Sequence, residues 1–201
     1  MPSQIYKMAK TTIKQHDITD CGATCLASIS AHYNLQLPIA RIRQYASTDK
    51  KGTNVLGLIE AAEKLGFEAK GVRGEIDSLF KIPKPAIAHI IVKEQLHHYV
   101  VIYEVAKEYI KIMDPGDGKI HNRMHEEFLK EWTGVLVLLL PKEEFTPTNE
   151  KVSVLKRFWF LLKPHKFVLL QALIGAVIYT LLGFSTSIYI QKNYRLCFSR
   201  R

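Results

Sequence analysis

The stretch KQHDITDCGATC, residues 14–25, is a polar segment that leads into an apolar one. From Cys25 onward, apolar side chains recur at helical spacing, which predicts a helix over residues 21–33. Cys21 then lies in the first turn of that helix, where the partial positive charge of the helix end favours a thiolate. Cys21 is therefore a candidate nucleophile, and the alternative is a buried cysteine that only packs.

The charged residues are unevenly distributed along the chain. Residues 1–150 carry 19 Lys and Arg against 19 Asp and Glu, whereas residues 151–201 carry 9 basic residues and no acidic one. The net charge of +9 therefore comes from the C-terminal segment, which is typical of a membrane-flanking region rather than a DNA-binding surface. Because we find no basic helix, zinc-finger spacing or aromatic RNA-binding pattern, we expect no nucleic-acid partner.

Length and cysteine content narrow the class of protein further. At 201 residues the chain can hold one domain with a sizeable core and an appendage. Its three cysteines are odd in number and too few for a disulfide framework, which favours a reducing compartment. The N-terminus has no long apolar run of the kind found in a secretory signal.

Helical patterns come first along the chain, and strand patterns follow. Apolar periodicity predicts helices over residues 21–33, 38–46 and 54–65. Alternating or β-branched runs predict strands over residues 67–72, 85–92, 98–105, 108–113 and 135–140, with a short helix near 125–132. This order predicts an α+β domain over residues 1–140, with helices packed on an antiparallel sheet. Residues 141–150 are nearly devoid of large apolar side chains, so we expect a linker with little to pack against.

A cysteine nucleophile needs a base and a group that orients the base, and His98 and Asp114 are the best-placed candidates. His98 opens one predicted strand, and Asp114 ends the next. In an antiparallel hairpin the start of the first strand lies beside the end of the second, so the two side chains can be neighbours. Two alternatives stay open, because Asp114 also suits a turn before Pro-Gly and His97 is an equal candidate by composition.

Two residues close to Cys21 in the sequence have different expected roles. Gln15 lies six residues upstream of Cys21, and its amide N–H is the type of donor that stabilises an oxyanion. Cys25, one helical turn beyond Cys21, is expected to pack rather than to react. A zinc site built from both cysteines and a histidine would match no common ligand spacing, so we expect no metal site.

These residues lie in motifs that resemble a known family. Gln15 is followed by Asp-Cys-Gly-Ala at residues 20–23, His98 begins the run HYVVI, and Asp114 begins Asp-Pro-Gly. In this order, over about residues 10–140, the motifs resemble those of bacteriocin-processing cysteine peptidases, the N-terminal domain of peptidase-containing ABC transporters.

The resemblance implies a papain-like fold and assigns the site residues. It implies that Cys21 is the nucleophile, that His98 rather than His97 is the base, and that Asp114 orients the base. It implies that Gln15 is the oxyanion-hole donor and that the reaction needs no cofactor. The implied substrate is a precursor peptide whose leader ends in a double-glycine-type motif, and cleavage after that motif releases a bacteriocin or similar peptide.

Residues 167–190 form a run of 24 residues with no charge and one amide, Gln171. This length is sufficient to cross a hydrocarbon core of about 30 Å. We therefore expect a transmembrane helix over residues 167–190, after a linker and juxtamembrane segment over 141–166 and before a short basic tail over 191–201. The alternative is a buried hairpin of amphipathic helices.

Charge around this run bears on its orientation. Basic residues precede it, and the positive-inside tendency would place the first domain on the cytoplasmic side of the bacterial inner membrane. Basic residues also follow it, so charge alone does not settle the orientation.

The end of the sequence departs from the family pattern. Complete relatives are expected to continue with five more spans and a nucleotide-binding domain, whereas this sequence ends at Arg201 and contains no Walker A motif. We therefore expect no ATP site in this chain. We also expect this chain to be a family member that is truncated after its first transmembrane helix, through a frameshift or a shortened gene. The expected partners are the remaining parts of the transporter.

Three functions stay open from the residues. The leading hypothesis is a cysteine endopeptidase that removes leaders from precursor peptides in association with ABC-type export. The rival is a module that holds leader peptides without cutting them, and the third is an inert fragment of a transporter gene. The presence of Cys21 favours catalysis, because non-cleaving relatives have lost the nucleophile.

Overall fold

The structure, a computed structural model, describes residues 10–50, 52–93, 95–149 and 154–198. The chain forms two compact units, Met1–Lys151 and Val152–Arg201. All of the candidate catalytic residues belong to the first unit, and the long apolar run belongs to the second.

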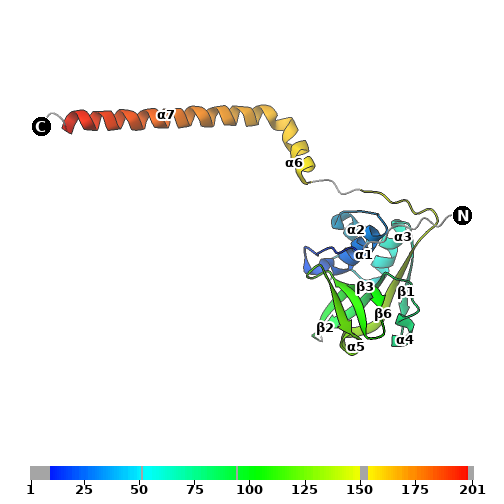
Figure 1. The fold of residues 1–201 in the computed structure, drawn as a ribbon. Helices are drawn as coiled ribbons and strands as arrows, with labels where there is room; N and C mark the ends of the chain where they lie inside the picture. The colour runs from blue at the N-terminus through cyan, green and yellow to red at the C-terminus, as the bar shows by residue number, and fades with distance from the viewer. Residues whose placement is uncertain (1–9, 51, 94, 150–153, 199–201) are drawn as a thin grey trace. The chain divides into compact units, whose positions relative to one another are not determined.

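Three helices come first in the first unit, after a short 3-10 turn (Figure 1). The turn is η1 (Ile18–Asp20), and the helices are α1 (Cys21–His32), α2 (Ile39–Tyr45) and α3 (Val55–Lys64). Capping side chains define two of these starts: Asp17 accepts a hydrogen bond from the backbone of Thr19, and Asn54 accepts one from the backbone of Gly57 at 2.7 Å. Helix α1, expected over residues 21–33, begins at the predicted residue and ends one residue earlier than predicted.

Six antiparallel strands form one sheet in the order β1-β6-β2-β3-β4-β5. Their bounds are β1 (Phe67–Arg73), β2 (Ala86–Val92), β3 (Leu96–Val105), β4 (Tyr109–Asp114), β5 (Lys119–Met124) and β6 (Trp132–Pro141). Because helices pack on an antiparallel sheet, the predicted α+β class is confirmed.

The sheet and its connections differ from the prediction most clearly at β5, α4 and the start of β6. Strand β5, which pairs with β4, and the short helix α4 (Ile76–Leu79) were not predicted. The short helix α5 (His125–Glu131) was predicted, but β6 begins directly after it at Trp132 rather than at Val135. Trp132 pairs with Ile90 of β2, and its aromatic side chain suits a strand better than a helix end.

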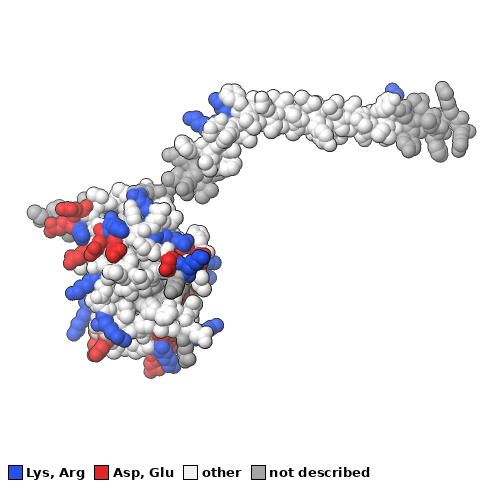
Figure 2. Space-filling model, turned by 180° about the vertical axis from the view of Figure 1, so that it is seen from behind, with Lys and Arg blue, Asp and Glu red and all other residues white. Residues whose placement is uncertain are grey.

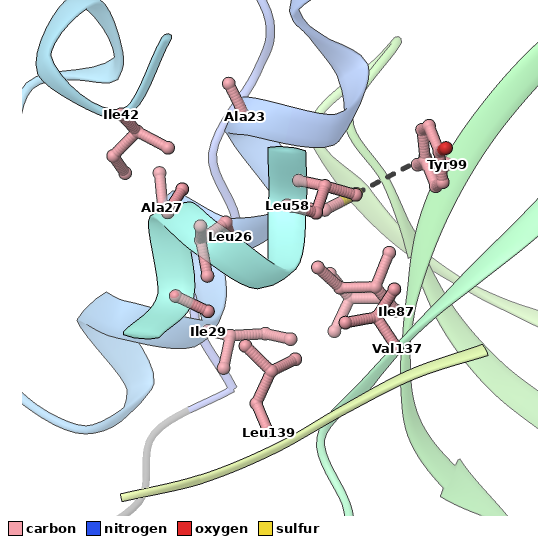
Figure 3. Close-up of a cluster of buried hydrophobic side chains, with 14 of the residues drawn as sticks. Ala23, Leu26, Ala27, Ile29, Ile42, Leu58, Ile87, Tyr99, Val137 and Leu139 are labelled. Atoms are coloured by element: carbon pink, nitrogen blue, oxygen red, sulfur yellow. Dashed lines mark hydrogen bonds between the residues drawn. The ribbon is translucent and has the colours of Figure 1, made fainter. Parts of the chain in front are cut away.

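Two clusters of buried side chains stabilise the first unit. Tyr99 and Val101 of β3 belong to the first cluster, and Val100 and Ile102 belong to the second, so the clusters lie on opposite faces of the sheet. In the first cluster, apolar side chains of α1 and α3 pack against β2 and β6, as Figure 3 shows for Leu26, Ile29, Leu58, Ile87, Val137 and Leu139. This packing presses α1 against the sheet and so places its first residue, Cys21.

The segment after β6 does not behave as expected. The ring of Phe145 lies 4.8 Å from that of Phe67, centroid to centroid, and packs against the first cluster. The backbone N–H of Gln36 donates to the carbonyl of Thr148 at 2.9 Å. The expectation that this segment has little to pack against is therefore wrong, because the ring of Phe145 packs against the rings of Tyr33 and Phe67.

The second unit consists of helical segments. They are α6 (Val154–Leu162), η2 (Lys163–His165) and α7 (Lys166–Phe198), and Pro164 in η2 accounts for the break between the two helices. One candidate membrane span, Phe158–Lys192, has a mean hydropathy of 2.2, which makes it long and apolar enough to cross a membrane. Figure 2 shows almost no charged side chains along the part of α7 that is not grey, whereas basic and acidic side chains are scattered over the first unit.

Candidate active site

Cys21 is the first residue of α1 and is only 5 % exposed. Gly22 allows the start of this helix to lie close to the sheet: a Cβ atom at Gly22 would lie 3.1 Å from Cβ of Thr53 and 3.3 Å from the ring of Tyr99. The glycine of the Asp-Cys-Gly motif thus has a packing role. The sulfur lies at a helix N-terminus, where orphan backbone N–H groups favour negative charge.

His98 and Asp114 are brought together by the pairing of β3 with β4. Nε2 of His98 lies 2.8 Å from Oδ1 of Asp114, and the same oxygen accepts a hydrogen bond from the backbone N–H of Gly116 at 2.8 Å. Because Nε2 carries the proton that faces the carboxylate, Nδ1 is the ring nitrogen left for the thiol of Cys21. The turn that follows β4 therefore both holds the carboxylate and aims it at the imidazole.

Electrostatics favour a charged imidazole at this position. Burial lowers the pKa of His98, but hydrogen bonds to Asp114 and Cys21 and the charges of both outweigh burial and raise the pKa to about 9. Because the folded chain holds this proton more tightly than an unfolded chain, the interaction adds stability below about pH 6.5 that is lost as the pH rises through about 9. Burial alone would raise the pKa of Asp114, yet hydrogen bonds from His98 and Gly116 lower it overall. The pair can thus exist as imidazolium and carboxylate near neutral pH.

Gln15 is attached to the same turn through its backbone. Its N–H donates to the carbonyl of Pro115 at 2.8 Å, one residue after Asp114. Its side-chain oxygen is buried and accepts no hydrogen bond from any residue that the structure describes. The carboxamide oxygen is therefore an acceptor with no donor among the described residues.

A second group of histidines lies beside the first. Nδ1 of His97 is 3.1 Å from Nε2 of His89, and Nδ1 of His89 is 2.9 Å from the hydroxyl of Thr133. Burial, followed by the charges of His97 and His98, lowers the pKa of His89. The side chains of His97 and His98 thus have different partners, and Asp114 is bonded to His98.

A pocket of about 400 Å³ opens beside Cys21. The polar side chains of His97 and Lys50 line it, and Ile18 and Leu96, which are 64 % and 45 % exposed, form part of its apolar wall. A peptide can therefore approach the sulfur from this side without unfolding the domain.

Cys25 has a packing role, as its spacing suggested. Its side chain is fully buried, and its thiol donates to the carbonyl of Tyr99 at 3.3 Å. Burial, followed by the charges of Cys21 and Asp114, raises the pKa of Cys25 well above its ordinary value. Cys25 therefore remains a thiol, and of the two cysteines Cys21 is the one suited to nucleophilic attack.

Sequence reasoning missed one ion pair next to the nucleophile. Asp20 is 2 % exposed, and its Oδ1 lies 3.1 Å from a guanidinium nitrogen of Arg43. Because a buried carboxylate requires a cation, the arginines in the helix that follows were the signal in the sequence that could have indicated this pair. This pair ties α2 to the start of α1. Among the described residues, no group of three His, Cys, Asp or Glu side chains is arranged to hold a metal ion.

Comparison with known proteins identifies the family. Residues 9–144 match the model of the peptidase C39 family. The lactococcin-G-processing and transport ATP-binding protein LagD of Lactococcus lactis subsp. lactis is 39 % identical over 184 residues, which are 90 % of this chain and 25 % of the relative. This chain therefore spans about a quarter of the length of that relative.

Two solved structures are similar to the first unit. The peptidase domain of Streptococcus ComA, a bifunctional ABC transporter, has a TM-score of 0.63 at 36 % identity and covers 67 % of this chain and 100 % of its own. A double glycine motif protease from an AMS/PCAT transporter, in complex with its leader peptide, has a TM-score of 0.62 at 30 % identity and covers 70 % and 98 %. The chain belongs to the peptidase C39 family, and its first unit is a cysteine peptidase domain.

Proposed function

We propose that this chain removes the double-glycine-type leader from a precursor peptide by cysteine-dependent hydrolysis. The observation that carries the proposal is the hydrogen bond between His98 and Asp114, which holds an imidazole toward Cys21 at the start of a buried helix. A similar protease that was solved with a leader peptide bound supports the substrate class. A non-cleaving leader-binding module would have no need of this nucleophile and base.

The proposed reaction assigns one step to each side chain. The thiolate of Cys21 attacks the carbonyl carbon of the second glycine, and the carboxamide of Gln15 donates to the oxyanion. His98 gives its proton to the leaving amine as the C–N bond breaks, so the mature peptide departs and a thioester remains. His98 then takes a proton from water, which attacks the thioester and releases the leader with a free carboxylate. Asp114 keeps the imidazole oriented through both steps.

The proposal extends to the setting of the enzyme. We place the apolar helix across a bacterial cytoplasmic membrane, with the peptidase unit on the cytoplasmic side where precursors are made. The length and hydropathy of Phe158–Lys192 and the basic residues that precede the uncharged run support this placement. The similarity to processing and transport ATP-binding proteins supports the remaining parts of an ABC transporter as partners. The proposed hydrolysis requires no cofactor.

Mass spectrometry of cleavage products tests the proposal. The full chain in detergent micelles is incubated with precursor peptides encoded near its gene and with the lactococcin G precursor, and the cut is located by mass. We expect one cut, directly after the double-glycine-type motif. Cys21→Ala should abolish the cut while leader binding, measured by fluorescence anisotropy, survives, because the sulfur forms the acyl-enzyme and adds little to docking. Cleavage that persists in Cys21→Ala, or a cut elsewhere, would refute the proposal.

A further inference from the structure

Residues 10–15, here called the N-terminal strap, run as irregular chain beside the sheet and end at Gln15. The hydroxyl of Tyr103 donates to the carbonyl of Thr11 at 2.5 Å. The ammonium of Lys10 lies 2.7 Å from the carboxylate of Glu104. Both partners of the strap belong to β3, the strand that also carries His98, so the strap is held to the framework of the site.

The other end of the strap is held by the turn that follows β4. The backbone N–H of Gln15 donates to Pro115, and Lys14 lies against Gly118. A Cβ atom at Gly118 would lie 2.8 Å from Cβ of Lys14 and 3.1 Å from its backbone, and the φ angle of Gly118 is +71°. Only glycine therefore combines this backbone conformation with this close approach.

The two contacts with β3 differ in strength. Tyr103 is 7 % exposed, and burial raises the pKa of its phenol, which therefore remains a hydrogen-bond donor throughout the working pH range. The side chains of Lys10 and Glu104 are 41 % and 42 % exposed, so water screens their ion pair. Tyr103 is thus the main anchor of the strap on this strand.

We propose that Tyr103 and Gly118 are positioning residues that hold the carboxamide of Gln15 where the oxyanion forms, by fixing the strap at both ends. The proposal rests on the proposed peptidase function. The motif places Gln15 upstream of the nucleophile, but no regular helix or strand holds residues 10–15. Two tertiary anchors supply that rigidity, and the N–H groups of the Gln15 carboxamide are the donors that an oxyanion requires.

Steady-state kinetics of the full chain test the proposal, with the precursor peptide that is cleaved fastest. Gln15→Ala should lower kcat by about a hundredfold or more with KM nearly unchanged, because the donor acts mainly in the transition state. Tyr103→Phe removes only the hydroxyl and should lower kcat by about threefold to tenfold, as expected for one neutral hydrogen bond, again with KM nearly unchanged. In the Gln15→Ala background, Tyr103→Phe should have no further effect on kcat, because the group that it positions is gone.

One further variant and two controls separate a positioning role from general damage to the fold. Gly118→Ala should act in the same direction as Tyr103→Phe, through displacement of Lys14. Tyr33→Phe, at a buried tyrosine of the same core cluster, should leave kcat unchanged. The rate at which iodoacetamide alkylates Cys21 should stay at the wild-type value in Tyr103→Phe, since the strap does not act through the thiol.

Each contrary result has a distinct meaning. An equal loss of kcat from Tyr103→Phe in both backgrounds, or a slower alkylation of Cys21, would show a structural role and overturn the proposal. Full activity in Gln15→Ala would overturn it as well, while cysteine-dependent cleavage would still stand. Failure of the proposed function itself would appear separately, as cleavage that persists in Cys21→Ala.

Discussion

His98 and His97 are consecutive residues of β3, and their side chains have different surroundings. His98 is 8 % exposed and bonded to Asp114, and its pKa is raised to about 9. His97 is exposed and stacks on His89, whose pKa is lowered by burial and then by the charges of the neighbouring histidines. A carboxylate partner keeps a buried imidazole charged, whereas a histidine partner disfavours charge. The carboxylate partner therefore distinguishes His98 from the histidines beside it.

The largest effect should come from the bonded histidine. We expect His98→Ala to lower kcat/KM by about a hundredfold to ten-thousandfold, the range for loss of a general acid and base. Cleavage assays on the full chain measure this, with the circular dichroism spectrum as a check on folding. If His97→Ala were the more damaging substitution, the base would be misassigned and the comparison would be reversed.

Removal of the carboxylate should take away the partner that distinguishes His98 from His97. In wild type we expect kcat/KM to fall above about pH 9, where His98 loses the proton that it gives to the leaving amine. In Asp114→Asn, loss of the charge and hydrogen bond that raise the pKa of His98 should move this alkaline limb to lower pH by about one to three pH units. The full pH profile of both proteins decides the matter. An alkaline limb at the same pH in both would mean that Asp114 does not control His98.

The smallest effect should come from the stacked histidine. We expect His97→Ala to change kcat by no more than about twofold, because Asp114 is bonded to His98 and not to His97; its place in the pocket wall affects KM instead. A parallel measurement on His89→Ala shows whether the second group matters as a whole. A loss comparable with that of His98→Ala would place this group in the catalytic machinery after all.

Much of the fold was predictable from local patterns. Helical periodicity defined α1, α2 and α3, and β-branched runs defined most of the strands. Strand β5 was missed because residues 119–124 contain mostly polar side chains and so lack a strand pattern. This strand forms through its pairing with β4. The packing of Phe145 was missed because a lone aromatic residue in a charged segment gives no periodic signal.

In the site, too, some features were predictable from the sequence and others were not. Cys21 at a helix start, Gln15 upstream and Asp114 at a strand end were readable from spacing, and the long apolar run was readable from composition. On residue type alone His97 and His98 were equal, and the motif resemblance favoured His98.

Tertiary structure decided the partners. The register of β3 on β4, with Val101 opposite Met113, brings His98 to Asp114, and the pairing of β3 with β2 brings His97 to His89. The anchors Tyr103 and Gly118 of the strap likewise come from distant parts of the sequence. Local sequence sets periodicity and helix ends because those depend on near neighbours in the chain. Contacts between distant residues depend on strand register and close packing, which only the folded chain specifies.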